Sequence, residues 1–220
     1  MIRPKRIKER VDAKVAEISA KIDRFKGRRA GHINQVAELS GKLAAKIRLT
    51  DAENSSLQIA ARLSGIGELV MDRESDPTSL DSKVLQIADN QRHPVIGEQE
   101  LHNLQFDRMT QLAVRWHREN WDGSGYPDAL REQEIPIICR ILRVADSFVS
   151  ISEKNPSLGP REILEIIKES AGIDFDPSVV MVLSELDMFE IQKEVEPPSE
   201  DTLSDRSTDA GDGSEAEVSS

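Results

Sequence analysis

Three histidines and one aspartate in this chain are of the residue types that form metal sites. His32, His93 and His117 lie on or beside predicted helices, and Asp146 follows on a later helix, in the segment RVADSF. Imidazoles and a carboxylate that project from separate helices into a bundle core commonly ligate metal ions. Four such ligands can complete the tetrahedral shell of a single Zn²⁺. The alternative, which we favour, is that they only hydrogen-bond within the bundle and that no cofactor is bound.

A long segment of the chain carries an ordered motif. It runs from Trp116 to Phe148 and reads WHRENWDGSGYPDALREQEIPIICRILRVADSF. This block resembles the signature of HD-GYP domains, and the segments Gly31–Leu39, Gln91–Gly97 and Gly172–Val180 also fit that family. The resemblance implies an all-helical HD-superfamily fold and a site of two or three iron or manganese ions. It also implies hydrolysis of cyclic di-GMP in bacterial signalling.

The chain departs from the family at the centre of the implied metal site. His32, His93, His117 and Asp146 match ligand positions of the family. The family's adjacent His-Asp pair, whose Asp bridges the metals, is replaced by Ser64 and Gly65.

Two further family positions have changed. The family lysine that contacts phosphate is replaced by Glu68, and the second histidine of the tandem pair is Arg118. A two-metal mechanism needs the bridging carboxylate, and loss of even an outer-shell partner costs about 10–100-fold in affinity or activity. We therefore expect no catalytic residues, and we expect the Arg118 guanidinium to contact an anion without cleaving it.

The glycine-rich loop of the motif is intact. Its residues either brace the helix bundle or contact a partner protein. The resemblance implies that such a partner is a GGDEF-type diguanylate cyclase domain. The loop residues are Trp121, Asp122, Gly125, Tyr126 and Pro127. The main hypothesis is a signalling domain that binds a protein or nucleotide, with cyclic di-GMP as one ligand. The alternative is a divergent phosphodiesterase that holds one Fe, Mn or Zn ion in a reduced site.

Apolar residues recur every three or four positions along most of the chain, which predicts helices. Residues 1–29 form an amphipathic leader helix whose narrow stripe needs the body or a second copy as its partner, so a homodimer is one alternative. Residues 30–191 form the helical domain, and the acidic segment 192–220 is predicted to be disordered. Within the domain we expect helices at about 30–49, 51–63, 82–89, 107–120, 137–151, 160–170 and 177–188, a short one after Pro94, and a loop at 72–81.

The composition narrows the classes of function. A single cysteine, Cys139, excludes an internal disulfide framework. There is no apolar run long enough for a membrane span and no secretory signal, so we expect a cytoplasmic protein. The net charge is −11, and the basic first 29 residues have no interleaved aromatics to stack on bases. We therefore predict no nucleic-acid partner.

Overall fold

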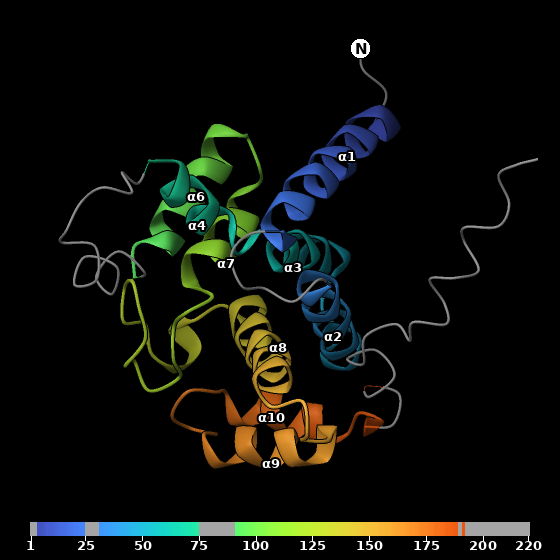
Figure 1. Cartoon of the computed structure of the whole chain (residues 1–220), viewed down its shortest axis with the longest axis vertical. Helices are drawn as coiled ribbons and strands as arrows, with labels where there is room; N and C mark the ends of the chain where they lie inside the picture. Colours follow the sequence, from blue (N-terminus) through green and yellow to red (C-terminus); the bar gives the residue numbers. More distant parts are fainter. Residues whose placement is uncertain (1–3, 25–30, 75–90, 189–190, 192–220) are drawn as a thin grey trace, which may run out of the picture.

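The computed structural model describes residues 4–24, 31–74, 91–188 and 191, and these residues are almost entirely helical. Figure 1 shows α8 (Ile137–Lys154) near the centre of the molecule. It packs against α2 (His32–Ile47), α3 (Asp51–Leu63) and α7 (Arg108–Trp116). The helices α9 (Pro160–Glu169) and α10 (Pro177–Ser184) cover one end of it. The predicted all-α bundle is confirmed.

Two helices form a tight layer beside α7. They are α4 (Ile66–Glu74) and α6 (His93–Asn103), and they meet at Gly67 and Gly97. A Cβ atom on Gly67 would overlap the backbone carbonyl of His93. The absence of a side chain at Gly67 therefore allows the approach that places α4 next to His93.

The first helix, α1 (Pro4–Asp23), finds its partner in the body of the protein. Val15, Ile18 and Ile22 are buried, and α1 contacts α3 and α4. The N-terminal part of α1 extends away from the bundle (Figure 1). The predicted apolar stripe thus packs against the domain itself, and the homodimer remains a prediction.

Local sequence signals account for several helix ends. Thr50 caps α3: its hydroxyl accepts from the Glu53 N–H, and the Glu53 carboxylate accepts from the Thr50 N–H at 2.8 Å. Pro160 and Pro177 occupy the first turns of α9 and α10, where the missing N–H costs nothing.

Several expected boundaries were wrong. Residues 66–74 form α4, a helix that we did not predict, and its last three residues fall in the expected loop at 72–81. The helix α7 ends at Trp116 rather than at residue 120, and α10 ends at Ser184 rather than at residue 188. The helix α8 continues to Lys154 rather than ending at residue 151. The expected helix at 82–89, the rest of the loop at 75–81 and the tail at 192–220 lie outside the described residues.

No strand is present among the described residues, apart from one isolated bridge between Ala171 and Phe175. The remaining short element is the 3₁₀ turn η1 (Glu132–Glu134). None of the described helices has the length and apolarity that crossing a bilayer requires.

Candidate functional site

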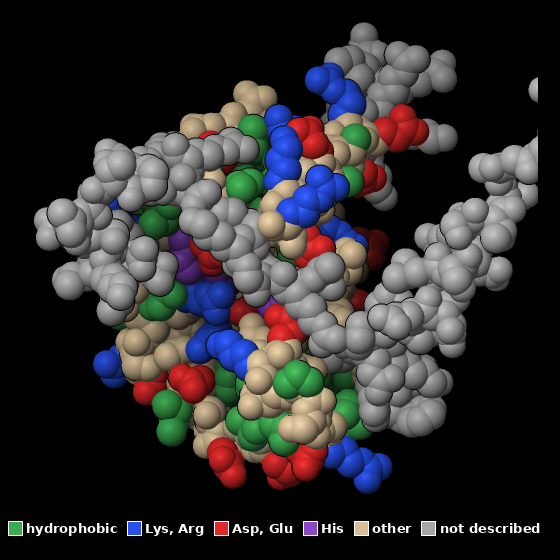
Figure 2. Space-filling view, in the orientation of Figure 1, with side chains coloured by type: hydrophobic (Ala, Val, Ile, Leu, Met, Phe, Trp, Pro, Cys, Tyr) green, Lys and Arg blue, Asp and Glu red, His purple; other side chains and the backbone are tan. Residues whose placement is uncertain are grey.

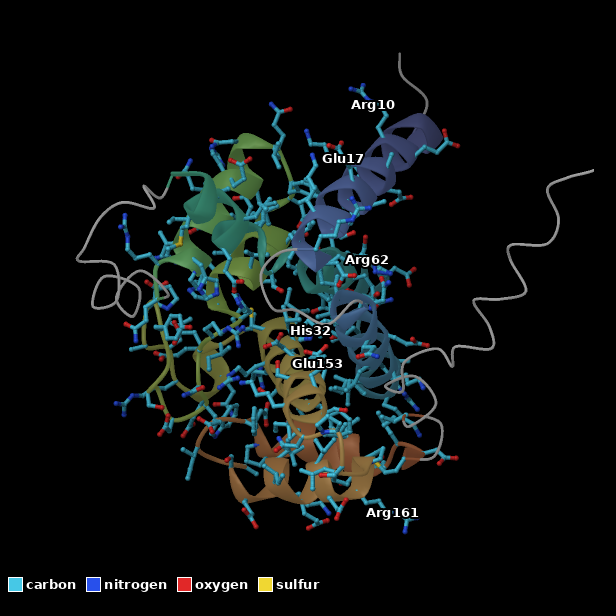
Figure 3. All side chains as sticks on the ribbon, in the orientation of Figure 1. Arg10, Glu17, His32, Arg62, Glu153 and Arg161 are labelled. Atoms are coloured by element: carbon cyan, nitrogen blue, oxygen red, sulfur yellow. The ribbon has the colours of Figure 1, made fainter. Side chains whose placement is uncertain are left out.

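His32 and Asp146 form one half of the site, between α2 and α8. His32 is the first residue of α2, and its Nε2 lies 3.4 Å from Asp146 Oδ1. Its Nδ1 lies 3.0 Å from Oε2 of Glu153, which is two helical turns beyond Asp146 on α8. Figure 3 shows His32 and Glu153 next to each other. Burial on its own would lower the pKa of His32, but the bonds to the two carboxylates outweigh it and raise this pKa to about 9.

Arg118 completes this cluster from the chain just after α7. Its Nη1 donates to Asp146 Oδ2 at 2.9 Å, so both oxygens of the buried Asp146 carboxylate have a partner. Burial on its own would raise the pKa of Asp146. The charge of Arg118 and the hydrogen bond from His32 overcome this and hold the pKa far below its usual range. Asp146 is therefore an anion neutralised by a guanidinium.

His93 and His117 form the other half of the site. Their Nε2 atoms lie 3.2 Å apart, and His117 Nδ1 donates to the Val114 carbonyl at 2.7 Å. Burial, and then the positive charge of Arg118, hold the pKa of His117 well below its ordinary value. Its imidazole is therefore neutral, with Nε2 as an acceptor, and His93 Nε2 is the donor of this pair. The ring of Tyr126 stands edge-on to His93, with centroids 6.3 Å apart.

Ser64 and Gly65, which we predicted at the positions of the family's central pair, lie at the turn between α3 and α4. Ser64 ends α3 and is buried, and Gly65 follows it. Glu68, in the first turn of α4, has its Oε1 4.0 Å from His93 Nε2. The residue that we predicted in place of the family lysine thus brings a carboxylate next to His93.

The glycine-rich loop is held by one buried carboxylate, Glu119, and one exposed carboxylate, Asp128. Glu119 accepts from the backbone N–H groups of Asp128 at 2.7 Å and Leu130 at 3.1 Å. Asp128 in turn accepts two hydrogen bonds from Arg115 and one from Trp116 Nε1. These bonds tie the loop to the C-terminal end of α7 and to the segment that follows it.

The same loop is attached to the turn that precedes α10. The N–H of Trp121 donates to the Asp174 carbonyl at 3.3 Å, and that of Asp122 donates to the Ile173 carbonyl at 2.9 Å. The Tyr126 N–H donates to the Arg118 carbonyl, and the Tyr126–Pro127 peptide bond is cis. A Cβ at Gly125 would overlap backbone atoms of residues 118–120, so the loop lies directly over the Arg118 segment.

Comparison with known proteins identifies the family of this chain. The model of the family described as "HD domain" matches residues 14–179. This chain belongs to the HD domain family. A cyclic di-GMP phosphodiesterase of Thermotoga maritima is 31% identical over 163 residues, which cover 71% of this chain and 44% of the relative. A 3′3′-cGAMP-specific phosphodiesterase 2 of Vibrio cholerae is 31% identical over 162 residues, which cover 70% of this chain and 30% of the relative.

Solved structures share the fold of this HD domain. A cyclic GMP-AMP phosphodiesterase of V. cholerae, V-cGAP3, superposes with a TM-score of 0.65 at 18% identity, covering 87% of this chain and 51% of that one. Bd1817, an HDG"Y"P protein from Bdellovibrio bacteriovorus, superposes with a TM-score of 0.55 at 20% identity. The match covers 70% of this chain and 50% of that one. The resemblance to HD-GYP domains is therefore confirmed. The HD domain chain spans less than half the length of these two curated relatives.

The side chains of this HD domain do not fit a two-metal centre. The four residues predicted at ligand positions divide into the pairs His32–Asp146 and His93–His117, and Arg118 donates to the second oxygen of Asp146. Gly65 has no side chain to bridge two ions. Within the part of the chain that the structure describes, no group of three or more His, Cys, Asp or Glu side chains is arranged to hold an ion.

Sequence reasoning missed three residues of the HD domain site. Glu153 lies seven positions after Asp146, a spacing that puts both on one helix face and could have identified it. Arg143 precedes Asp146 by almost one turn and shares its surroundings. Glu119 could not be identified from the sequence, because its partners are backbone N–H groups of the loop, which lie near it only in the folded chain.

Proposed function

We propose that this HD domain is a signalling module that binds a nucleotide or a protein and does not hydrolyse cyclic dinucleotides. The observation that carries the proposal is the ion pair between Arg118 and Asp146, at 2.9 Å. It supplies a fixed positive charge at a carboxylate that the family uses as a metal ligand. A guanidinium can hold a phosphate but cannot generate a metal-bound hydroxide.

The residues around this pair support the same proposal. Gly65 cannot bridge two cations, and Glu68 places a negative charge beside His93, where an anionic substrate would otherwise meet a lysine. When bound, a two-metal centre supplies the attacking hydroxide and neutralises charge on the phosphoryl group. The residues of this chain instead orient the neutral His117 ring and keep Asp146 ionised.

A second candidate is a metal-dependent phosphodiesterase with a reduced site. The relatives support this enzyme more directly than they support a non-hydrolytic domain, since they are phosphodiesterases for cyclic di-GMP or 3′3′-cGAMP. Such an enzyme would hold a single Fe, Mn or Zn ion. His93 and His117 would have to separate from their mutual hydrogen bond to ligate it.

A hydrolysis assay separates the two candidates. Protein loaded with Mn²⁺ or Fe²⁺ under reducing conditions is incubated with cyclic di-GMP and with 3′3′-cGAMP, with and without a chelator. We expect no chelator-sensitive cleavage of either compound. Cleavage that the chelator stops, and that His117→Ala abolishes, would establish the phosphodiesterase instead.

A gain-of-function variant provides the positive control. The four substitutions Ser64→His, Gly65→Asp, Glu68→Lys and Arg118→His restore the family residues at every changed position. We expect this variant to retain at least one equivalent of Mn or Fe by elemental analysis, whereas the natural chain retains far less. Equal metal contents in the two proteins would contradict the assignment of Arg118 as the replacement for a ligand.

For a protein partner, we propose the glycine-rich loop as the contact surface, with a GGDEF-type domain as the first partner to test. The loop is held in place by Glu119 and by the turn before α10, so it offers a preformed surface. Binding to a purified GGDEF domain by biolayer interferometry should weaken about tenfold or more with Tyr126→Ala. It should stay unchanged with Arg161→Gln, on the distant α9. Equal binding by all three proteins would exclude the loop as the contact.

A further inference from the structure

A cavity of about 340 Å³ lies between α8, α9 and the turn that precedes α10. Its volume is at the lower end of the range for ligand pockets, about 300–1,000 Å³. On the face shown in Figure 2, Lys and Arg side chains gather beside histidine near the middle of the molecule. The basic residues in the cavity wall are Arg118, Arg143 and Lys154.

Arg143 is the unusual member of this wall. Its Nε and Nη2 donate to Asn120 Oδ1 at 3.2 and 2.9 Å, and its Nη1 donates to Ser147 Oγ at 2.7 Å. Its guanidinium lies over the Phe175 ring, 5.4 Å from the centroid. All these partners are neutral, and none of the described carboxylates forms an ion pair with it. Arg143 therefore holds a partly buried positive charge without a bonded anion.

The surroundings of Arg143 disfavour its charged form. Burial, and then the neighbouring charge of Arg118, lower the pKa of Arg143, and the more distant carboxylates of Asp146 and Asp174 offset this only in part. Arg118 is itself paired with Asp146 through one nitrogen, Nη1. Buried charges in proteins are normally paired. An anion that enters the cavity would supply the pairing that the protein lacks at Arg143.

We propose that this cavity binds the phosphate group of a nucleotide-sized ligand, with Arg143 as its main contact and Arg118 and Lys154 beside it. The inference rests on the proposed function, because it requires Arg118 to hold a charge where the family holds metal. Guanidinium groups bind phosphate oxygens through forked, charge-assisted hydrogen bonds. The hydroxyl of Ser150 adds a neutral donor to the same wall.

The rest of the wall fits the remainder of such a ligand. Ile151 and Ile166 provide apolar surface for a base or sugar. Asp174 also lines the cavity, and its carboxylate would repel a phosphate but accept hydrogen bonds from sugar hydroxyls. The phosphate is therefore expected at the α8 side of the cavity, and the hydroxyls at the turn before α10.

Calorimetric titration of the full chain in the presence of a chelator tests the proposal. The probes are inorganic phosphate, GMP, guanosine and cyclic di-GMP. We expect GMP to bind at least tenfold more tightly than guanosine, which corresponds to about 1.4 kcal/mol, and inorganic phosphate to compete with it. Tighter binding of GMP than of cyclic di-GMP assigns a phosphomonoester, and the reverse order assigns a phosphodiester.

Variants of two arginines localise the binding. Arg143→Gln should weaken the tighter nucleotide at least tenfold, and Arg143→Lys, which keeps the charge, should weaken it less. Arg161→Gln is the matched control, because Arg161 is exposed on α9, away from His32 and Glu153 (Figure 3). Circular dichroism verifies that each variant is folded.

Two outcomes would overturn this inference. One is that the natural chain binds neither phosphate nor either nucleotide at millimolar concentration. The other is that Arg143→Gln, in folded form, binds as tightly as the natural chain. Chelator-sensitive hydrolysis would overturn the proposed function instead, and it is read in a separate assay, so the two failures are distinguishable.

Discussion

Removal of the Arg118 guanidinium should destabilise the fold substantially, because it leaves Asp146 buried without its cation. Removing one partner of a buried ion pair costs about 3–5 kcal/mol. The Arg118 side chain is 25% exposed and that of Asp146 is 5% exposed, and His32 still donates to Oδ1. We therefore expect Arg118→Ala to lower the free energy of unfolding by about 3 kcal/mol, the lower end of this range. For a chain of this size that is about 6–12 °C in Tm.

Urea denaturation followed by circular dichroism at pH 7, with chelator present, measures this loss. Arg108→Ala is the control: its ion pair with Glu98 is at the surface, with 64% of the arginine side chain exposed, and such pairs contribute about 0–1 kcal/mol. Asp146→Asn should also destabilise, and the double variant should lose less than the sum of the two single losses.

One result would refute the reasoning. If Arg118→Ala were no less stable than Arg108→Ala, and chelator alone destabilised the natural chain, Asp146 would be neutralised by a bound ion and not by the arginine.

Three further predictions concern residues around the site. Gly67→Ala should lower the free energy of unfolding, measured by urea denaturation, by about 3 kcal/mol, because its Cβ would overlap the His93 carbonyl. Gly159→Ala is the control: a Cβ there meets its nearest atom at 3.7 Å, so the loss should be less than about 1 kcal/mol. Glu119→Ala leaves two loop N–H groups without their acceptor, so we expect a loss of about 3 kcal/mol and faster cleavage within residues 122–130 in limited proteolysis. The hydrogen bonds from its arginine partner, opposed by burial, hold the pKa of Asp128 at about 2. This stabilisation is present above about pH 4, the unfolded value, and is lost as the pH falls through 2. The urea midpoint of Asp128→Asn should therefore fall less steeply than that of the natural chain between pH 4 and 2.

Much of the fold could be predicted because helical periodicity and caps are local signals. The apolar stripe of α2 and the Thr50 cap of α3 are visible in the sequence and present in the structure. The helix α4 was not predicted, because glycine has a low intrinsic helix propensity and this segment contains Gly65 and Gly67. In the folded protein Gly67 belongs to the helix, because packing against α6 requires a residue without a side chain there.

The site was predictable as a set of positions but not as a set of contacts. The motif indicated that His32, His93, His117 and Asp146 would lie near one another. It could not show that they divide into two pairs, since that depends on which partner each ring and carboxylate meets. His32 and Glu153 are 121 positions apart in the sequence. The spacing of Glu153 from Asp146 puts both on one face of α8, but it does not show that this face meets His32.

The two backbone bonds between the glycine-rich loop and the turn before α10 make these segments one cooperative unit. Because the amides of Trp121 and Asp122 donate to carbonyls of that turn, neither segment can open without exposing the other, and their hydrogen exchange should be protected to the same degree. Asp174 contributes its carbonyl to this link and its side chain to the cavity wall. A molecule that tightens the cavity would thereby slow exchange in a loop that it does not touch.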